Sequence, residues 1–219
     1  MQIIANGIRI EVEDSAAGDT SRPVVLLIMG LGMQLIAWPD AFVARLVEQG
    51  YRVLRMDNRD IGLSQHFDHL RVPNILWASL LHRLRLPLRS PYLLEDLARD
   101  SLGVLDTLGI ARAHVLGVSM GGMVAQRLAL LAPGRLHSLC SVMSSSGAPG
   151  LPGAQPAVLR AMLSRPAKQE EDILVAHYVR LLKLIGSPGF PQAEGAVADR
   201  IRAGLRRSNH CLLYTSRCV

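Results

Sequence analysis

The chain of 219 residues lacks any apolar run long enough to cross a membrane. Its longest uninterrupted apolar stretch, residues 24–29, is far shorter than the roughly 20 residues that span a bilayer. The N-terminus also lacks the basic region and the apolar core of a signal peptide. We therefore expect a cytoplasmic protein with no membrane partner.

Cysteines are few, and their spacing fits neither a disulfide framework nor a metal site. Cys140, Cys211 and Cys218 form no CxxC pair and have no histidine at zinc-ligand spacing. We expect no metal and no redox chemistry.

Aromatic residues make up only 4% of the chain. The net charge of +6 could suggest nucleic-acid binding, but basic and acidic residues are interspersed and the aromatics are too few for a base-stacking surface. We therefore exclude nucleic acid as a partner. With 49% hydrophobic and 19% charged residues, the composition is that of a globular protein that can bury a core.

Apolar runs and helical patterns alternate along most of the chain. Residues 2–13 predict a short hairpin that turns at residues 5–7. Further strands are expected at residues 24–29, 51–56, 113–118 and 136–143, and helices at residues 39–49, 93–108 and 120–131. Strands buried on both faces and separated by helices are typical of a parallel sheet, so the fold class is α/β.

The character of the sequence changes after residue 146. Residues 147–153 are rich in glycine and proline, and residues 154–206 are helical and polar with no strand pattern. We assign residues 1–146 to the N-terminal part of the core and residues 147–210 to part of a helical cap over the carboxyl edge of the sheet.

The strongest chemical signal is the G-x-S-x-G motif around Ser119. Residues 113–118 form a predicted strand before it and a predicted helix follows, which is the context that gives the motif meaning. Gly117, Gly121 and Gly122 allow the close backbone approach of such a turn, and Ser119 would be a nucleophile at a helix N-terminus. The alternative is a serine that only caps a helix in a glycine-rich turn.

With this motif the chain resembles the α/β-hydrolase superfamily. Residues 27–32 end a strand where the family usually has His-Gly-x, with Met29 in place of the histidine. The resemblance implies an oxyanion hole made by the backbone N–H groups of Leu31 and Met120. It also implies a mostly parallel sheet with helices on both faces.

Residues 57–64 resemble the family's D-x-R-G-x-G-x-S loop, with Asp60 in place of the first glycine. We expect Asp57 and Arg59 to be structural and to pair with each other behind the site. The sequences of these motifs are similar to those of bacterial aclacinomycin methylesterase-like enzymes. Those enzymes in turn resemble cofactor-free haloperoxidases and enol-lactonases.

The resemblance implies a serine hydrolase that cleaves a small apolar ester through an acyl-enzyme on Ser119, with no metal or organic cofactor. Lactonase, thioesterase, C–C hydrolase and perhydrolase activities use the same arrangement of catalytic residues and are alternatives. A non-catalytic member that binds a ligand in the same pocket is a further alternative. Neither the sequence nor the resemblance predicts an oligomeric state.

The acid and histidine that the family places after the cap are missing. His137, His177 and His210 follow no late strand, and residues 144–146 are all serine. We therefore expect a fold that is incomplete at the C-terminus, an open sheet edge at residues 139–143, and little or no esterase turnover from the chain as it stands.

Residues 211–219 bear no relation to the arginine- and alanine-rich segment before them. One permitted back-translation from residue 213, completed by a TAA stop codon, is its own reverse complement and resembles the end sequence of a transposase used to fragment DNA for sequencing. We interpret this tail as translated adapter and expect the natural reading frame to continue past about His210.

Overall fold

A computed structural model describes residues 1–70, 86, 90–148, 150, 151, 153, 155–164, 166, 168, 170–190 and 192–208. The interpretation of residues 211–219 as a foreign tail lies outside these described residues.

The described part of the chain contains a six-stranded sheet with the strand order β1-β2-β4-β3-β5-β6. The strands are β1 (Gln2–Ala5), β2 (Ile8–Asp14), β3 (Val24–Ile28), β4 (Arg52–Met56), β5 (Ala113–Val118) and β6 (Leu136–Val142). The last four strands in this order run parallel to one another, while β2 pairs antiparallel with both β1 and β4. The mostly parallel α/β sheet expected from the sequence is therefore confirmed.

The first two strands form the predicted hairpin. Both residues of its turn have positive φ, 49° at Asn6 and 77° at Gly7. These are the residue types that adopt such angles most readily, and this turn suits the right-handed twist of the two strands.

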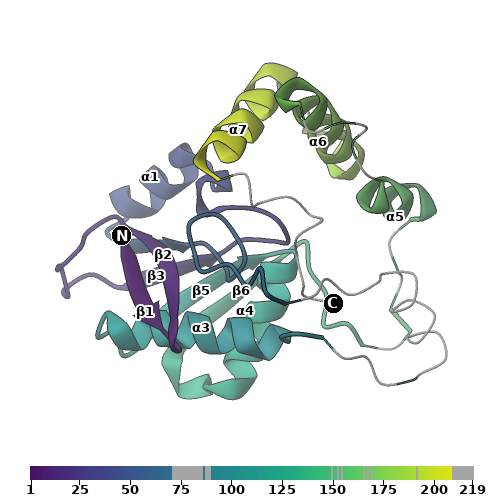
Figure 1. The fold of residues 1–219 in the computed structure, drawn as a ribbon. Helices are drawn as coiled ribbons and strands as arrows, with labels where there is room; N and C mark the ends of the chain where they lie inside the picture. The colour runs from purple at the N-terminus through teal and green to yellow at the C-terminus, as the bar shows by residue number, and fades with distance from the viewer. Residues whose placement is uncertain are drawn as a thin grey trace.

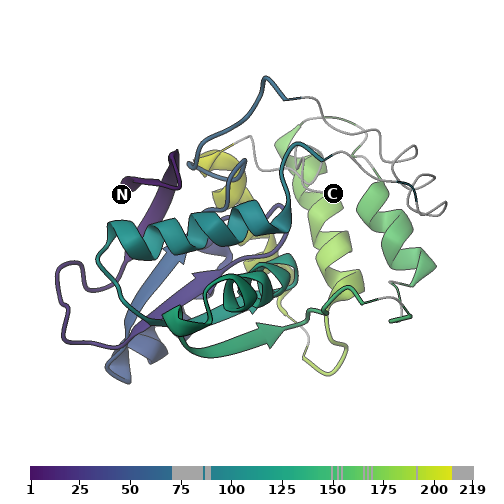
Figure 2. The ribbon, with the colours of Figure 1, turned by 90° about the horizontal axis from the view of Figure 1, so that it is seen from below.

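Helices cover both faces of the sheet (Figures 1 and 2). α1 (Asp40–Glu48) lies on one face, and α3 (Leu94–Thr107) and α4 (Met120–Leu131) lie on the other. Short 3-10 turns, η1 (Leu35–Ala37) and η2 (Pro133–Arg135), follow β3 and α4.

β3 shows why a continuous apolar run becomes a central strand. Val24, Leu26 and Ile28 pack in the cluster that contains α3 and α4, while Val25 and Leu27 pack in the cluster beneath α1. Successive side chains of a strand point to opposite faces, so a strand covered on both sides needs apolar residues at every position.

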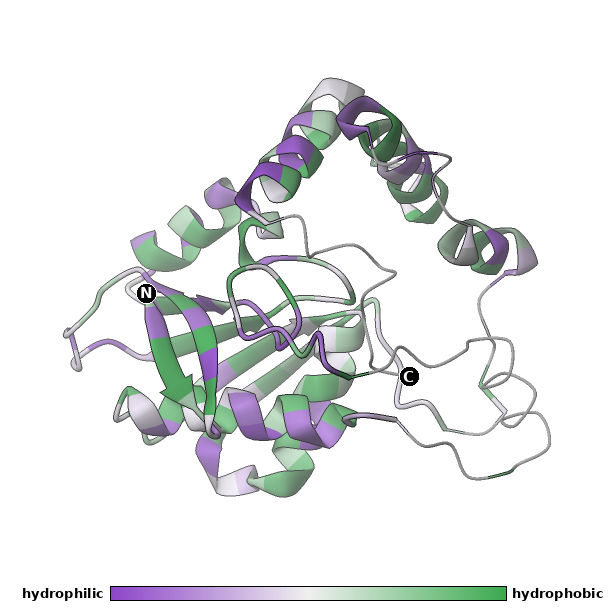
Figure 3. Cartoon of the chain, in the orientation of Figure 1, coloured by the Kyte–Doolittle hydropathy of each residue, from purple (hydrophilic) through white to green (hydrophobic). Residues whose placement is uncertain are grey.

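Three helices follow β6: α5 (Pro156–Leu163), α6 (Glu171–Ile185) and α7 (Glu194–Arg207). They form an arch beside the sheet, and α7 contacts η1 (Figure 1). Hydrophobic and hydrophilic residues alternate along α6 and α7 (Figure 3), as expected for helices buried on one face only. The helical character predicted for this region is confirmed, whereas its function as a cap stays a prediction. No helix in the described residues is long and apolar enough to cross a membrane.

β6 is the last strand of the sheet, in agreement with the open edge expected near residue 139. Its side chains are mostly exposed, with Leu139 at 39% and the following Met143 at 77% of their full accessibility. No other described strand pairs with the outer side of β6, and apolar side chains are exposed along this edge.

Candidate active site

Ser119 lies at a sharp turn between β5 and α4. Its φ and ψ are 56° and −120°, a conformation that non-glycine residues rarely adopt. The turn is held by the Ser119 N–H, which donates to the carbonyl of Val142 at 2.9 Å, and by the Gly122 N–H, which donates to the carbonyl of Ser119 at 2.9 Å. The side chain of Ser119 is exposed, as a nucleophile must be to meet a substrate.

The three glycines of the motif are needed for steric reasons. A Cβ at Gly117 would collide with the backbone of Gly121, and a Cβ at Gly121 would collide with the carbonyl of Ile28. A Cβ at Gly122 would lie 2.6 Å from the Cβ of Ser144. Each glycine therefore allows an approach of strand and helix that no side chain permits.

The loop after β3 packs directly against this turn. A Cβ built on Gly30 would lie 3.2 Å from the Cβ and 3.7 Å from the Oγ of Ser119. Within the described residues, the backbone N–H groups of Leu31 and Met120 make no hydrogen bond. The structure thus brings Ser119 next to Met120 and to the loop that contains Leu31, and the role of these two residues as oxyanion donors stays a prediction.

Two polar side chains after β4 hold the ends of this loop. Asn58 Nδ2 donates to the carbonyl of Met29 at 3.0 Å, and Asp57 Oδ1 accepts from the N–H of Leu35 at 2.7 Å. Asp57 Oδ2 also accepts from the N–H of Leu63 at 3.0 Å. Asp57 is fully buried, and this burial raises the pKa of its carboxyl group above the usual value of 3.8, against the opposing effect of these N–H donors.

The prediction that Asp57 pairs with Arg59 is wrong. Arg59 binds both carboxylate oxygens of Asp100, with Nε to Oδ2 at 2.6 Å and Nη2 to Oδ1 at 2.7 Å. Asp57 instead accepts from Nη1 of Arg207 at 2.6 Å. Arg59 points toward α3, so it ties β4 to that helix, while Asp57 ties β4 to α7.

Asp60, which replaces a glycine of the family loop, has a φ of 63°. Its carboxylate accepts from the hydroxyl of Tyr92 and from the N–H of Phe67, both at 2.7 Å. These bonds offset the strain of the left-handed backbone. The Arg59 guanidinium lies over the rings of Tyr92 and Phe67, at 5.3 and 5.7 Å from their centroids.

Three residues that bind this region, Gln34, Asp100 and Arg207, were not predicted from the sequence. Asp100 does carry a signal, because it falls on the apolar face of α3 between Leu97 and Val104. Gln34 and Arg207 carry no such signal, because they lie far apart in the chain and no local sequence pattern predicts their contact.

The described residues supply no acid–base partner to the serine. Among them, no histidine ring and no carboxylate is hydrogen-bonded to Ser119 Oγ. His114 and His137 lie against each other near the start of β5 and β6, with ring centroids 5.2 Å apart, and His177 lies on α6. Among the described residues there is also no cluster of three His, Cys, Asp or Glu side chains that could hold a metal ion.

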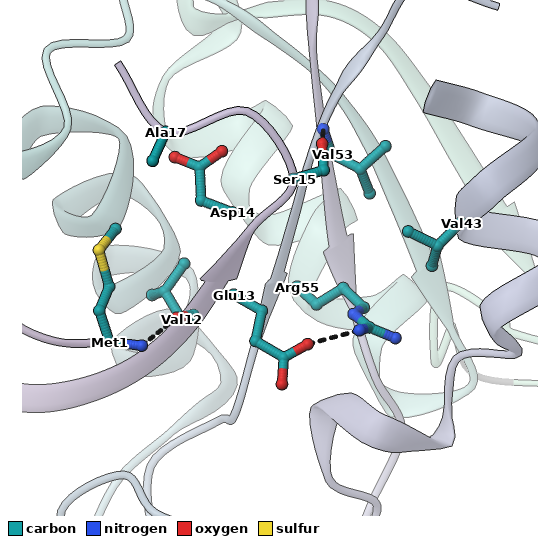
Figure 4. Close-up of a pocket in the computed structure, with 9 residues that line it drawn as sticks. All are labelled: Met1, Val12, Glu13, Asp14, Ser15, Ala17, Val43, Val53 and Arg55. Atoms are coloured by element: carbon teal, nitrogen blue, oxygen red, sulfur yellow. Dashed lines mark hydrogen bonds and ion pairs between the residues drawn. The ribbon is translucent and has the colours of Figure 1, made fainter. Parts of the chain in front are cut away.

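A shallow cleft of about 390 Å³ lies elsewhere, between the end of β2, β4 and α1 (Figure 4). Glu13 and Arg55 form an ion pair in it, and Asp14 is paired with Arg52 at 2.7 Å. None of the predicted site residues lines this cleft. Its charged groups are already engaged in ion pairs, so we assign the cleft no chemistry.

Comparison with known proteins identifies the family that shares this geometry. Residues 23–183 match the family model described as "alpha/beta hydrolase fold". The chain is 33% identical over 194 residues to rhodomycin D methylesterase DnrP of Streptomyces peucetius, an alignment that covers 80% of this chain and 58% of that protein. The chain thus spans less than two thirds of the length of this relative.

Solved structures agree. A hydrolase from Pseudomonas aeruginosa PA01 superimposes with a TM-score of 0.60 at 25% identity, covering 98% of this chain and 69% of that one. The 2-hydroxy-6-oxo-6-phenylhexa-2,4-dienoate hydrolase from Rhodococcus sp. strain RHA1 gives a TM-score of 0.65 at 21% identity, covering 98% and 70%. At this low identity, the similarity to the Rhodococcus enzyme shows a shared fold and nothing more. On the family match and this geometry together, the chain belongs to the α/β hydrolase fold family.

Proposed function

We propose that the protein hydrolyses a small apolar carboxylic ester through an acyl-enzyme on Ser119. The observation that carries the proposal is the exposed Ser119 at a strained turn, next to Leu31 and Met120, whose backbone N–H groups bind no other described residue. The likeness to a methylesterase supports an ester substrate, and a methyl ester is the form that likeness favours.

In the proposed reaction, Ser119 Oγ attacks the ester carbonyl carbon while a general base takes its proton. The N–H groups of Leu31 and Met120 stabilise the oxyanion, and the positive end of the α4 dipole adds to this effect. The alcohol leaves with the proton. Water, activated by the same base, then attacks the acyl-enzyme, releases the acid and restores Ser119. We propose that the acid and the base lie outside the described residues, because no described carboxylate or imidazole is hydrogen-bonded to Ser119 Oγ.

The test uses a fluorophosphonate probe and p-nitrophenyl acetate on the whole protein that contains residues 1–208. We expect covalent labelling and ester cleavage, both lost in Ser119→Ala and retained in Ser145→Ala, which changes an exposed serine. Labelling that persists in Ser119→Ala would show another nucleophile. An unlabelled, inactive wild type would favour a ligand-binding member of the family.

The 219-residue chain by itself is the second part of the test. We expect little or no turnover from it, because the described residues give Ser119 no base. Efficient hydrolysis by this chain that depends on Ser119 would contradict our account of the missing acid and base.

A further inference from the structure

Arg207 lies in the last turn of α7 but makes its contacts in the loops at the carboxyl edge of the sheet. Its Nη1 donates to Oδ2 of Asp57 at 2.6 Å and to Oε1 of Gln34 at 2.8 Å. Gln34 Nε2 donates back to the carbonyl of Gly204 at 2.7 Å. The side chain of Arg207 is only 16% exposed and that of Asp57 is fully buried. The two bonds of Arg207 are charge-assisted and largely shielded from solvent, so they are stronger than a surface ion pair.

The backbone is shaped around this contact. Gly62 has a φ of 58°, and a Cβ at this position would collide with Asp57 Oδ2 and lie 2.7 Å from Nη1 of Arg207. The loop therefore leaves space for a guanidinium that arrives from a helix 150 residues further along the chain.

The same groups hold the loop that carries Leu31. Gln34 lies directly before η1, and Asp57 accepts from the N–H of Leu35, the first residue of η1. At the other end of the loop, Asn58 holds the carbonyl of Met29. With both ends tied, the loop is fixed where Gly30, the residue before Leu31, packs against Ser119.

We propose that Arg207 is a positioning residue that couples α7 to the oxyanion loop, residues 29–35, through Gln34 and Asp57. The role in catalysis rests on the proposed function, whereas the coupling itself does not. A preorganised donor matters most when negative charge develops, so loss of the coupling slows the chemical step more than it weakens substrate binding.

The first experiment measures amide hydrogen exchange of the 219-residue chain as it exists. We expect Arg207→Gln to speed exchange in residues 29–36 by about tenfold, together with exchange in α7, while β5 and α4 stay unchanged. Arg207→Lys keeps the charge and is expected to restore part of the protection. The matched control is Arg206→Gln, which removes a 71% exposed neighbour that pairs with Glu171. Loosening of α7 alone, or an equal effect of the control, would overturn the proposal.

The second experiment measures ester hydrolysis by the whole protein. We expect Arg207→Gln to lower kcat by about tenfold at nearly constant KM, with partial rescue in Arg207→Lys and no change in Arg206→Gln. An unchanged kcat with faster exchange in residues 29–36 would overturn the positioning role. Activity that survives in Ser119→Ala would instead contradict the proposed function, and the exchange result would stand. If Arg207→Gln does not fold, Gln34→Leu removes the link to the loop and leaves the ion pair in place.

Discussion

The sheet with α3 and α4 and the helices that follow β6 are held together in different ways. In the sheet, large apolar side chains such as Leu26, Leu27 and Leu54 are completely buried. Among the residues of α5–α7 whose side chains the structure describes, the buried apolar ones are Leu174, Val175, Leu181 and Val197. The attachment of α7 to the sheet runs through Arg207, Gln34 and Asp57. Burial dominates the first region, and directed polar contacts orient the second.

This difference teaches where each region is sensitive. Apolar burial is spread over many contacts, so the stability of the core depends chiefly on its large apolar side chains. A polar attachment depends on a few atoms, so a single substitution can release α7 while the sheet stays folded.

The largest expected effect is that of Leu27→Ala in β3. The side chain is fully buried, so we expect a loss of about 2–5 kcal/mol in the free energy of unfolding, measured by urea titration. Leu181→Ala in α6 should leave unfolding of the sheet unchanged and speed amide exchange only in α6 and α7. If both variants lower the same transition equally, the two regions unfold as one.

The next effect is that of Gly121→Ala. The added methyl group meets the carbonyl of Ile28, so we expect a cost of about 1–3 kcal/mol or a shifted elbow. Gly134→Ala is the matched control, because a Cβ there meets no atom within 4 Å. Thermal unfolding compares the two, and equal midpoints would show that β5 and α4 can move apart freely.

A smaller effect, and one that depends on pH, is expected for Arg207→Gln. Burial raises the pKa of Asp57 above its usual 3.8, so the folded state favours the protonated acid and stability declines as pH rises through the folded pKa. Removing Arg207 takes away a donor and a positive charge, which raises this pKa further. The deficit of the variant should grow with pH to about 1–2 kcal/mol at neutrality.

Urea titrations of wild type and Arg207→Gln between pH 4 and 8 check this prediction. A deficit that is constant across the range would mean that the Arg207 contact does not act through the ionised carboxylate of Asp57. Arg206→Gln again serves as the control, since its guanidinium contacts Glu171 at the surface.

The smallest effect concerns His177 on α6. Burial, with a contribution from Arg180, lowers the pKa of this imidazole below its usual value of 6.5. The stability that the neutral ring contributes is present above that value and is lost as pH falls through the folded pKa. Exchange in α6, corrected for intrinsic rates, should rise between pH 7 and 5 and lose this dependence in His177→Gln. The same change at the exposed His69 should have no effect, and a persistent dependence in His177→Gln would exclude this ring as its source.

Much of the sheet could be predicted because its signals are local. β5 and α4 begin and end at the predicted residues, and the hairpin turns where Asn6 and Gly7 permit positive φ. The position of Ser119 between them follows from the same local order. The partner of Asp57 could not be predicted, because nearness in the sequence favoured Arg59 and only the folded chain brings Arg207 to it.

By itself, the sequence determined the parallel α/β sheet, the turn around Ser119 and the glycines that this turn requires. The spacing of apolar residues and the backbone freedom of glycine both act over a few residues, so they can be read locally. The tertiary structure alone decided the separate partners of Asp57 and Arg59 and the attachment of α7 to the oxyanion loop. Each of these depends on which surfaces meet after folding, and neither hydrophobic period nor motif spacing encodes contacts between segments so distant along the chain.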